Sequence, residues 1–411
     1  MLLFLVGIGP GIFAIGYTIG TGSVTTMIVA GSTYGMTLLW VLALSCLFSW
    51  VMMEAYGRYA VVTGETALFA FRRHLRGGKW LALFIIVGIT FGQWNSLIGI
   101  LGISANAVFE VLALFAPAAK GYEYGLVLGI AVAIIVLMYA VLWMGRYSLF
   151  ERVLIFFVSL MGLSFLLSLF IVHPPVGAVL SGLVPAFPKV EGGKMLAAAF
   201  VGTTMAAATF ISRPLFIRGK GWELKDLPLQ RRDALWAAVL IFLISGAIMA
   251  VAMGSLHSRG LGVTKVLDMV TALEPIAGRF AIALFFTGTL AAGLSSIFPI
   301  LMIAPLMVAD YQAGKLDTNS RQFRLLAGVA CLVGLAVPIL GANPIRAQIL
   351  TQVFNIFVLP AVVGGMIVLV NRSSLMGAHR AGPWLNVGMG LAFLFSCLVS
   401  YTGAVAVWEN F

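Results

Sequence analysis

Charge is what this sequence has least of. Lysine, arginine, aspartate and glutamate together make up only 9% of the 411 residues, whereas 61% are hydrophobic. A soluble globular protein is about a quarter charged and nearer half apolar. Because surface area still grows with mass, no water-soluble core of this size could bury so much apolar surface. The scarcity of charge therefore excludes a soluble enzyme, a disordered tail and a secreted disulfide scaffold, and it indicates a polytopic helical membrane protein.

Cysteine and histidine are also scarce, with 3 and 4 residues respectively. Cys46, Cys331 and Cys397 all lie inside apolar segments, and no pair has the spacing of a metal site, so we interpret them as small packing residues. The histidines fall near segment ends or in loops, which gives little support to a zinc cluster or a buried proton relay. We therefore expect no resident metal, no cofactor and no enzyme activity.

Long apolar stretches are abundant. A membrane-spanning helix needs about 20 mostly apolar residues. The stretches that meet this test are approximately 3–31, 37–57, 80–103, 124–145, 149–172, 194–217, 233–256, 277–308, 322–341, 347–371 and 384–408. The first has neither a basic leader nor a small-residue cleavage site, so we interpret it as a membrane helix and not as a removable signal. The connections are short, which predicts one membrane domain over residues 1–411.

The formal net charge is +11, but the basic residues follow a membrane pattern and we expect no nucleic-acid partner. Most of them fall in even-numbered connections: Arg72, Arg73, Arg76, Lys79, Arg218, Lys220, Lys225, Arg231, Arg232, Lys315, Arg321, Arg372 and Arg380. Cytoplasmic loops carry an excess of Lys and Arg. We therefore predict a multi-pass protein of the bacterial cytoplasmic membrane, with its N-terminus inside and the lipid bilayer as its surroundings.

Two of the apolar stretches are interrupted by glycines and hydroxyl residues. The first contains Gly20-Thr21-Gly22-Ser23, and the sixth contains Gly202-Thr203-Thr204. Because the sixth stretch comes five places after the first, they occupy matching positions in two five-helix halves, which predicts an inverted repeat with broken helices around a midplane site. Its parts would be a first repeat over about 1–172, a second over about 194–371 and an extra helix over about 384–408. Ordinary close packing of small residues is the alternative.

Short motifs along nearly the whole chain resemble one family. They are Gly9-Pro10-Gly11, Arg58, Val62-Thr63-Gly64, Glu151-Arg152, Gly182-Leu183-Val184-Pro185, Leu273-Glu274-Pro275, Ala292-Gly293-Leu294-Ser295-Ser296 and Thr351-Gln352-Val353. This set is similar to the Nramp family of divalent-metal transporters. The resemblance implies an all-α membrane protein with a LeuT-like 5+5 inverted repeat plus an eleventh helix, and alternating access around a midplane site.

The functional residues of that family are largely replaced in this chain. Its metal-holding Asp-Pro-Gly-Asn falls on Gly20, Thr21, Gly22 and Ser23. Its Ala and Met of the sixth helix fall on Thr203 and Ala206, its second histidine on Arg213, and its acidic pair of the third helix on Gln93 and Ser96. Gln352 does match a family position near the ion.

These replacements remove the ligands for a dehydrated metal ion and the titratable side chains for proton coupling. A dehydrated divalent cation needs hard oxygens with negative charge, and proton coupling needs a titratable side chain in the pathway. We find no Asp, Glu or His near the middle of the first, third, sixth, eighth or tenth stretch. Glu54 lies in the second stretch, where we expect it to pair with Arg58 one turn later.

The remaining candidates are neutral or basic. We predict a substrate site made of Gly20, Thr21, Gly22, Ser23, Thr203, Thr204, Ala206 and Gln352, and a wider pathway with Gln93, Ser96, Thr209, Arg213 and Asn355. A half-helix beginning near Ser23 would present free N–H groups and a positive dipole end, which favours an anionic or strongly dipolar solute. Arg213 either adds to this field or extends to the membrane interface.

Three functions follow from these patterns. The first is a secondary transporter of a small polar or anionic solute. The second is an atypical divalent-cation transporter that passes a partly hydrated Mg²⁺ or Mn²⁺ without proton coupling. The third is a non-transporting sensor that retains the fold, as in the ethylene-signalling protein with an Nramp-like domain. That protein depends on a large soluble tail, whereas this sequence ends at Phe411, so we expect a transporter.

Overall fold

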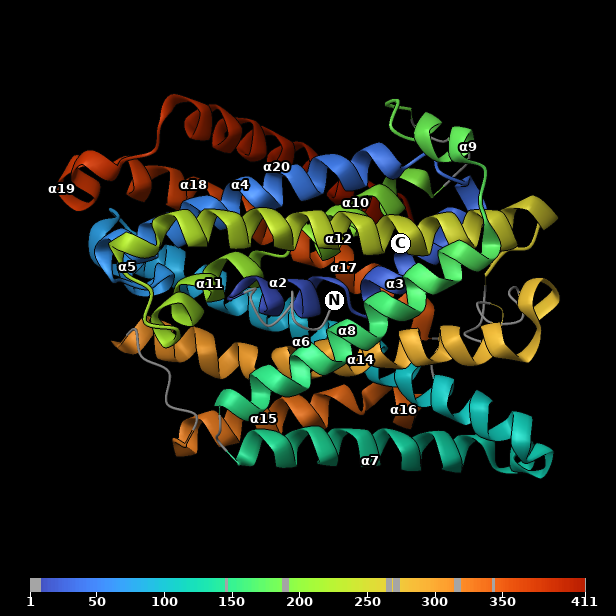
Figure 1. The fold of residues 1–411 in the computed structure, drawn as a ribbon. Helices are drawn as coiled ribbons and strands as arrows, with labels where there is room; N and C mark the ends of the chain where they lie inside the picture. Colours follow the sequence, from blue (N-terminus) through green and yellow to red (C-terminus); the bar gives the residue numbers. More distant parts are fainter. Residues whose placement is uncertain are drawn as a thin grey trace.

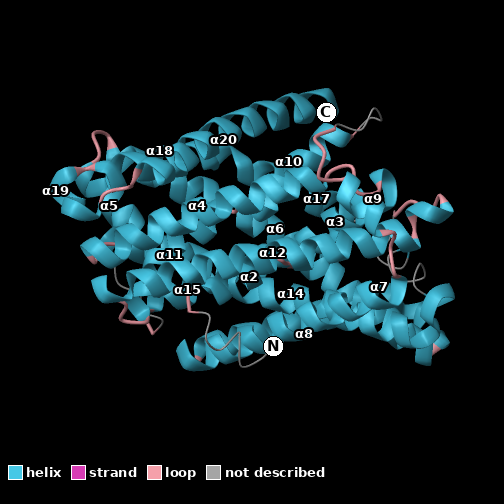
Figure 2. Ribbon diagram, turned by 45° about the horizontal axis from the view of Figure 1, so that its top comes forward, coloured by secondary structure: helices cyan, strands magenta, loops and turns pink. Residues whose placement is uncertain are grey.

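The computed structural model describes residues 9–144, 147–186, 192–263, 268, 274–313, 319–341 and 344–410, and this part of the chain contains helices and no strand (Figure 2). The long or broken helices are α2 (Gly11–Thr18), α3 (Thr21–Tyr34), α4 (Leu39–Thr63), α6 (Gly78–Phe115), α7 (Glu123–Trp143), α8 (Tyr147–Val172), α10 (Gly193–Thr204), α11 (Ala207–Gly219), α12 (Leu227–Ser255), α14 (Glu274–Ala313), α15 (Arg321–Gly334), α16 (Ala336–Leu340), α17 (Pro344–Phe354), α18 (Leu359–Asn371) and α20 (Pro383–Asn410). Short elements connect them: α5 (Ala67–His74), η1 (Pro117–Tyr122), α9 (Val176–Ser181), η2 (Leu224–Asp226), η3 (His257–Arg259), η4 (Asn355–Val358), α19 (Ser373–Met376) and η5 (Gly377–His379).

The expected membrane spans are present. In the described residues, 10 helices are long and apolar enough to cross a membrane, or 11 when the bent pair α2–α3 is taken as one span. The prediction of an all-α, multi-pass membrane protein is therefore confirmed. Residues 3–8 of the first predicted stretch, together with Lys315 and Leu273, lie outside the described residues.

Two interruptions were not predicted. The ninth stretch is divided into α15 and α16, and the tenth is divided by the 3₁₀ turn η4, after which Pro360 stands in the first turn of α18. Proline has no N–H to donate and is tolerated in a first turn, so Pro360 fits the restart of the helix. The interruption at η4 brings Asn355 to the central cavity described below.

The broken helices lie at the centre of the bundle. In the most apolar stretch of Gly193–Gly219, which contains α10 and α11, 94% of the residues are buried, against 28% in the corresponding stretches of α7 and α20. In Figure 1, α7 and α20 run along opposite outer sides of the bundle, with α2, α10, α11 and α17 between them. The centre is therefore shielded from lipid by protein, which is the condition under which non-helical backbone is tolerated at membrane depth.

The basic connections gather at one end of the bundle. Figure 1 shows α5, α19, the start of α15 and the turn between α11 and α12 together at the left, whereas α9 and η1 lie at the right. The common side predicted from the even-numbered connections agrees with this arrangement. That this side faces the cytoplasm stays a prediction from the positive-inside rule.

Candidate functional site

The first helix is broken where the glycines predicted a break. Helix α2 ends at Thr18 and α3 starts at Thr21, and the two helices are bent by 54°. Between them, Gly20 is extended, with φ −96° and ψ −175°. A β-carbon at Gly20 would lie only 2.1 Å from Ser296 Oγ of α14, so close packing, rather than backbone strain, requires a glycine here.

The sixth stretch is broken in the same manner but without a sharp bend. Helix α10 ends at Thr204, and α11 begins at Ala207 after an extended Ala206 with ψ 114°. No side chain caps the start of α3 or of α11, and neither first turn contains an acid. The first N–H groups of a helix have no partner within it and carry the positive end of its dipole. Two uncapped helix N-termini therefore adjoin the breaks.

A small cavity lies between the two breaks. Its lining consists of Tyr17, Thr18, Gly20, Gly22, Ser23, Gln93, Ser96, Ile100, Gly202, Thr203, Ala206, Ser296, Ile300, Gln352 and Asn355. The space open to the centre of a water molecule is about 20 Å³, enough for one or two waters. Helices α2, α3, α6, α10, α14 and α17 and the turn η4 all contribute, so the cavity joins residues from both halves of the chain.

One wall of the cavity is a connected chain of neutral side chains. Gln93 Nε2 donates to Asn355 Oδ1 at 3.0 Å, and Asn355 Nδ2 donates to Gln352 Oε1 at 3.1 Å. Gln352 Nε2 and Gln348 Nε2 then both donate to Ser96 Oγ at 3.0 Å. This network holds α6 against α17 and η4. It occupies the place where the family resemblance implies an acidic pair, at Gln93 and Ser96.

Around the first break, two backbone carbonyls accept hydrogen bonds, whereas three nearby hydroxyls make none. Ser296 Oγ donates to the Gly16 carbonyl at 2.9 Å, and Thr203 Oγ1 donates to the Thr18 carbonyl at 3.2 Å. By contrast, the buried hydroxyls of Tyr17, Thr18 and Ser23 have no hydrogen-bond partner. Buried polar atoms are normally paired, so such a group of unpaired hydroxyls on a cavity needs an explanation, and a bound solute or water supplies one.

The structure brings most of the predicted site residues together. Those that line the cavity are Gly20, Gly22, Ser23, Gln93, Ser96, Thr203, Ala206, Gln352 and Asn355. Thr21, Thr204 and Thr209 do not line it. Thr21 packs on Gly293 of α14, and the Thr204 carbonyl accepts from Ser49 Oγ at 2.8 Å.

Arg213 lies neither at the cavity nor at the membrane interface, the two positions expected from the sequence. Its Nη2 lies 2.7 Å from Asp233 Oδ2, and the two side chains are only 1% and 2% exposed. Asp233 also accepts the Gly11 N–H, at 3.1 and 3.0 Å to its two oxygens. Arg213 therefore neither lines the cavity nor extends to the membrane interface. Asp233 lies at the start of the seventh predicted stretch. Its pairing with Arg213 was not predicted, because nothing in the local sequence places it beside a residue 20 positions earlier.

The predicted pairing of Glu54 with Arg58 is confirmed, with Oε1 and Nη2 2.8 Å apart. Arg231 Nε also lies 3.4 Å from Glu54 Oε1, and Gln230 Nε2 donates to the Glu54 backbone carbonyl at 3.0 Å. Glu54 therefore contacts basic and amide side chains of α4 and α12. It does not line the central cavity.

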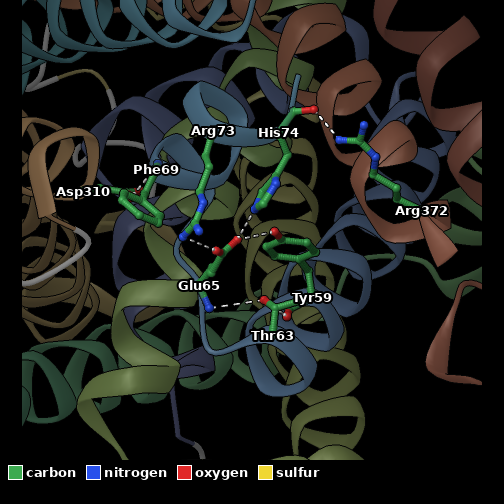
Figure 3. A network of polar contacts seen from close by, with 8 residues as sticks. All are labelled: Tyr59, Thr63, Glu65, Phe69, Arg73, His74, Asp310 and Arg372. Atoms are coloured by element: carbon green, nitrogen blue, oxygen red, sulfur yellow. Dashed lines mark hydrogen bonds and ion pairs between the residues drawn. The ribbon is translucent and has the colours of Figure 1, made fainter. Parts of the chain in front are cut away.

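A second charged cluster, also missed from the sequence, joins α4 to α5. Glu65 accepts from Tyr59 Oη at 2.9 Å and lies 2.8 Å from His74 Nε2 and 3.5 Å from Arg73 Nη1 (Figure 3). Nearby, Asp310 of α14 accepts the N–H groups of Leu68 and Phe69 at 3.1 Å. Asp310 thereby caps the start of α5 from a distant helix, which no local motif indicates.

No carboxylate, histidine or methionine sulfur lines the cavity, as far as the described residues go. The same residues contain no group of three or more His, Cys, Asp or Glu that could hold a metal ion. The cavity therefore offers hydroxyl, amide and backbone groups only.

Known proteins match both the sequence and the fold. The model for "Natural resistance-associated macrophage protein-like" proteins matches residues 11–406. Relatives named divalent metal cation transporter MntH, from Vibrio campbellii and Mycobacterium tuberculosis, are 26% identical to this chain. The alignments cover 97% and 95% of this chain and 91% and 89% of the relatives.

Among solved structures, a mutant of the Eremococcus coleocola manganese transporter has a TM-score of 0.74 at 15% identity, covering 98% of this chain and 86% of that one. MhsT in complex with L-phenylalanine has a TM-score of 0.68 at 16% identity, covering 98% of both chains. These similarities show the LeuT-like fold that the resemblance implied. Because the family match contains both broken helices and the whole lining of the cavity, this chain belongs to the Nramp family, a family of membrane transporters and not of enzymes.

Proposed function

We propose that this chain is an alternating-access secondary transporter whose central cavity binds a small polar or anionic solute, in place of a proton-coupled Mn²⁺ or Fe²⁺. The observation that carries the proposal is the lining of the cavity. It combines neutral hydrogen-bonding groups with two uncapped helix N-termini, and none of its residues is acidic.

Electrostatics favour a negative charge or dipole in this cavity. A divalent cation that loses its water needs charged oxygens, usually one or two carboxylates. Two backbone carbonyls at the first break are already taken by Ser296 and Thr203. The starts of α3 and α11 instead supply N–H groups and positive dipole ends, which attract a carboxylate or another anionic group.

Proton transfer through the cavity lacks a carrier. Among the residues that the structure describes, the lining contains no Asp, Glu or His, and these are the residues that form proton relays in transporters. The carboxylates of Glu54 and Asp233 lie outside the lining and have basic partners at 2.8 and 2.7 Å. We infer that transport proceeds without proton movement through this site.

Alternating access requires two halves that move against each other. We propose that α2–α3 and α10–α11 are the first elements of two repeats, over about 1–172 and 194–371, with an extra helix over about 384–408. The cavity between these broken helices is the position at which inverted-repeat transporters bind their cargo.

A second candidate is an atypical divalent-cation transporter. Relatives that match over nearly the whole chain are named divalent metal cation transporters, and the cavity is the size of a water molecule rather than of an organic solute. Mg²⁺ keeps several of its waters when bound, so hydroxyl and amide groups could hold it through water.

Flux through reconstituted vesicles separates these candidates. A thermal-shift screen of the purified protein against metals, amino acids and organic acids selects solutes for counterflow. We expect counterflow with an anionic or dipolar solute, and Mn²⁺ and Mg²⁺ uptake no greater than in empty vesicles. Robust Mg²⁺ uptake would overturn the proposal in favour of the second candidate. A sensor would show no counterflow with any solute.

A gain of metal binding tests the site itself. Gly20→Asp alone would collide with Ser296, so the carboxylate needs Ser296→Gly beside it, with Ala206→Met to supply sulfur. We expect this triple variant to bind Mn²⁺ in calorimetry. The matched control carries Gly20→Asn with the same two other changes, which keeps the shape and removes the charge. Equal Mn²⁺ binding by the two variants, or none by either, would count against the assigned position.

A further inference from the structure

An elongated groove lies between α7 and α15 on the outer side of the bundle. Its volume is about 710 Å³ and its lining is Ile135, Val136, Tyr139, Trp143, Arg321, Arg324, Leu325, Gly328, Val329, Cys331 and Leu332. The middle and far end of the groove are apolar, with Val136 59% and Leu332 72% exposed. Helices α7 and α15 run side by side here (Figure 1). The groove therefore opens toward the lipid and away from the central cavity.

The end of the groove nearest α5 and α19 is basic and aromatic. The Arg324 guanidinium lies 4.2 Å from the centre of the Trp143 ring, and Tyr139 Oη donates to the Arg324 carbonyl at 3.0 Å. Arg324 Nε is buried and has no hydrogen-bond partner among the residues that the structure describes. Arg321, one turn earlier on α15, is exposed. The Trp143 ring thus holds the Arg324 guanidinium at the mouth of the groove, where its Nε–H is left to donate to a ligand.

Neither helix neutralises these two charges. Helix α15 contains no acid, and the single acid of α7, Glu123, is its first residue, about 30 Å from Trp143 along the helix. Arginine and tryptophan are typical of the region where lipid headgroups lie, and basic pockets between membrane helices bind anionic headgroups. The groove therefore has a basic mouth that suits an anionic headgroup and apolar walls that suit an acyl chain.

We propose that this groove is a binding site for an anionic glycerophospholipid. The phosphate would sit between Arg321 and Arg324, and one acyl chain would lie along the apolar walls of α7 and α15. An anionic headgroup complements the two arginines, whereas the choline of phosphatidylcholine brings a positive charge to the same place. The site lies outside the central cavity, so it does not depend on which cargo the protein carries.

Native mass spectrometry of the intact protein tests this site with dioleoyl phosphatidylglycerol and dioleoyl phosphatidylcholine as probes. We expect the wild type to retain phosphatidylglycerol in preference, and Arg321→Gln and Arg324→Gln each to reduce that preference about five-fold. Arg380→Gln is the matched control, because Arg380 is exposed and is absent from the groove lining. It follows η5, which contacts α19, and α19 lies at the same end of the bundle as the start of α15 (Figure 1). An unchanged preference in the double variant Arg321→Gln/Arg324→Gln would overturn the proposal.

A second variant tests the acyl channel without changing charge. A β-carbon at Gly328 would lie 3.5 Å from Tyr139 Oη, an ordinary contact, so Gly328→Phe adds its ring to the groove with little strain on the helix. We expect this variant to lose tightly retained phosphatidylglycerol while its melting temperature without lipid stays within a few degrees of wild type. Full retention by a folded Gly328→Phe would place the lipid elsewhere and overturn the site.

Discussion

The charged layer of this protein pairs its carboxylates with basic side chains, whereas the central cavity leaves several of its hydroxyls without hydrogen-bond partners. The charged layer comprises Glu54, Arg58, Glu65, Arg213 and Asp233, toward the α5 end of the bundle. Each of its acids has a basic partner within 2.8 Å, Glu65 through His74. Within the described part of the chain, no charged side chain lines the cavity, yet the hydroxyls of Tyr17, Thr18 and Ser23 on its lining are buried without partners.

The difference separates polar groups that support the fold from polar groups that are available to the proposed cargo. A buried charge without a partner is strongly destabilising, and Glu54, Glu65 and Asp233 each have a basic side chain beside them. An unpaired buried hydroxyl costs about 1–3 kcal/mol, which a bound solute or water can offset. We infer that the paired charges of this layer support the scaffold, and that the neutral groups of the cavity are available to the proposed solute.

Removing one partner of the buried ion pair should break the charged layer most severely. Asp233→Leu leaves Arg213 uncompensated and deprives the Gly11 N–H of its acceptor. We expect a loss of about 3–5 kcal/mol of stability, measured as a large drop in melting temperature in detergent.

The double variant Arg213→Met/Asp233→Leu is the control for this experiment. It replaces the pair by apolar side chains of similar volume and should recover much of the lost stability, because a buried pair is worth little over a hydrophobic substitute. If the single and double variants melt together, the effect comes from the lost contact with Gly11 and not from an uncompensated charge.

Crowding the cavity should give the next largest effect. A β-carbon at Gly202 would lie only 1.9 Å from the Gln352 carbonyl, so Gly202→Ala must push α10 away from α17. We expect about 1–3 kcal/mol of destabilisation and loss of solute counterflow. Gly219→Ala is the control, since no atom lies within 4 Å of its added carbon. Normal counterflow by Gly202→Ala would show that the α10–α17 contact does not shape the transport site.

The amide network offers a finer test of the cavity wall. Ser96 Oγ accepts from both Gln348 Nε2 and Gln352 Nε2, so Ser96→Ala leaves two buried donors unpaired. We expect about 1–3 kcal/mol of destabilisation and altered affinity in counterflow. Ser159→Ala is the matched control, because Ser159 is buried but bonds only to the Ile155 carbonyl of its own helix. Equal effects of the two substitutions would contradict a special role for the Ser96 network.

Local patterns in the sequence predicted the cavity better than the charged layer. The glycine-rich break at Gly20 and the small residues near Ala206 are local signals, and both breaks are observed at these residues. The pairing of Glu54 with Arg58 was also predictable, because residues four apart share a helix face. The contacts of Asp233 with Gly11 and of Asp310 with Leu68 span 222 and 242 positions. Such contacts depend on how distant helices pack, which no single-sequence period reveals.

The smallest expected effect comes from Arg73, which lies beside the charged layer and contacts its Glu65. Arg73 lies 3.5 Å from Glu65, but its side chain is 62% exposed, whereas Arg58 is only 14% exposed in its pair with Glu54. Solvent screening limits an exposed pair to about 0–1 kcal/mol, so we expect Arg73→Gln to change the melting temperature barely and Arg58→Gln to lower it clearly. If Arg73→Gln lowers the melting temperature as much as Arg58→Gln, the burial of an ion pair does not determine how much it stabilises this protein. The charged network around Glu65 would then act as one cooperative unit that closes α5 onto α4.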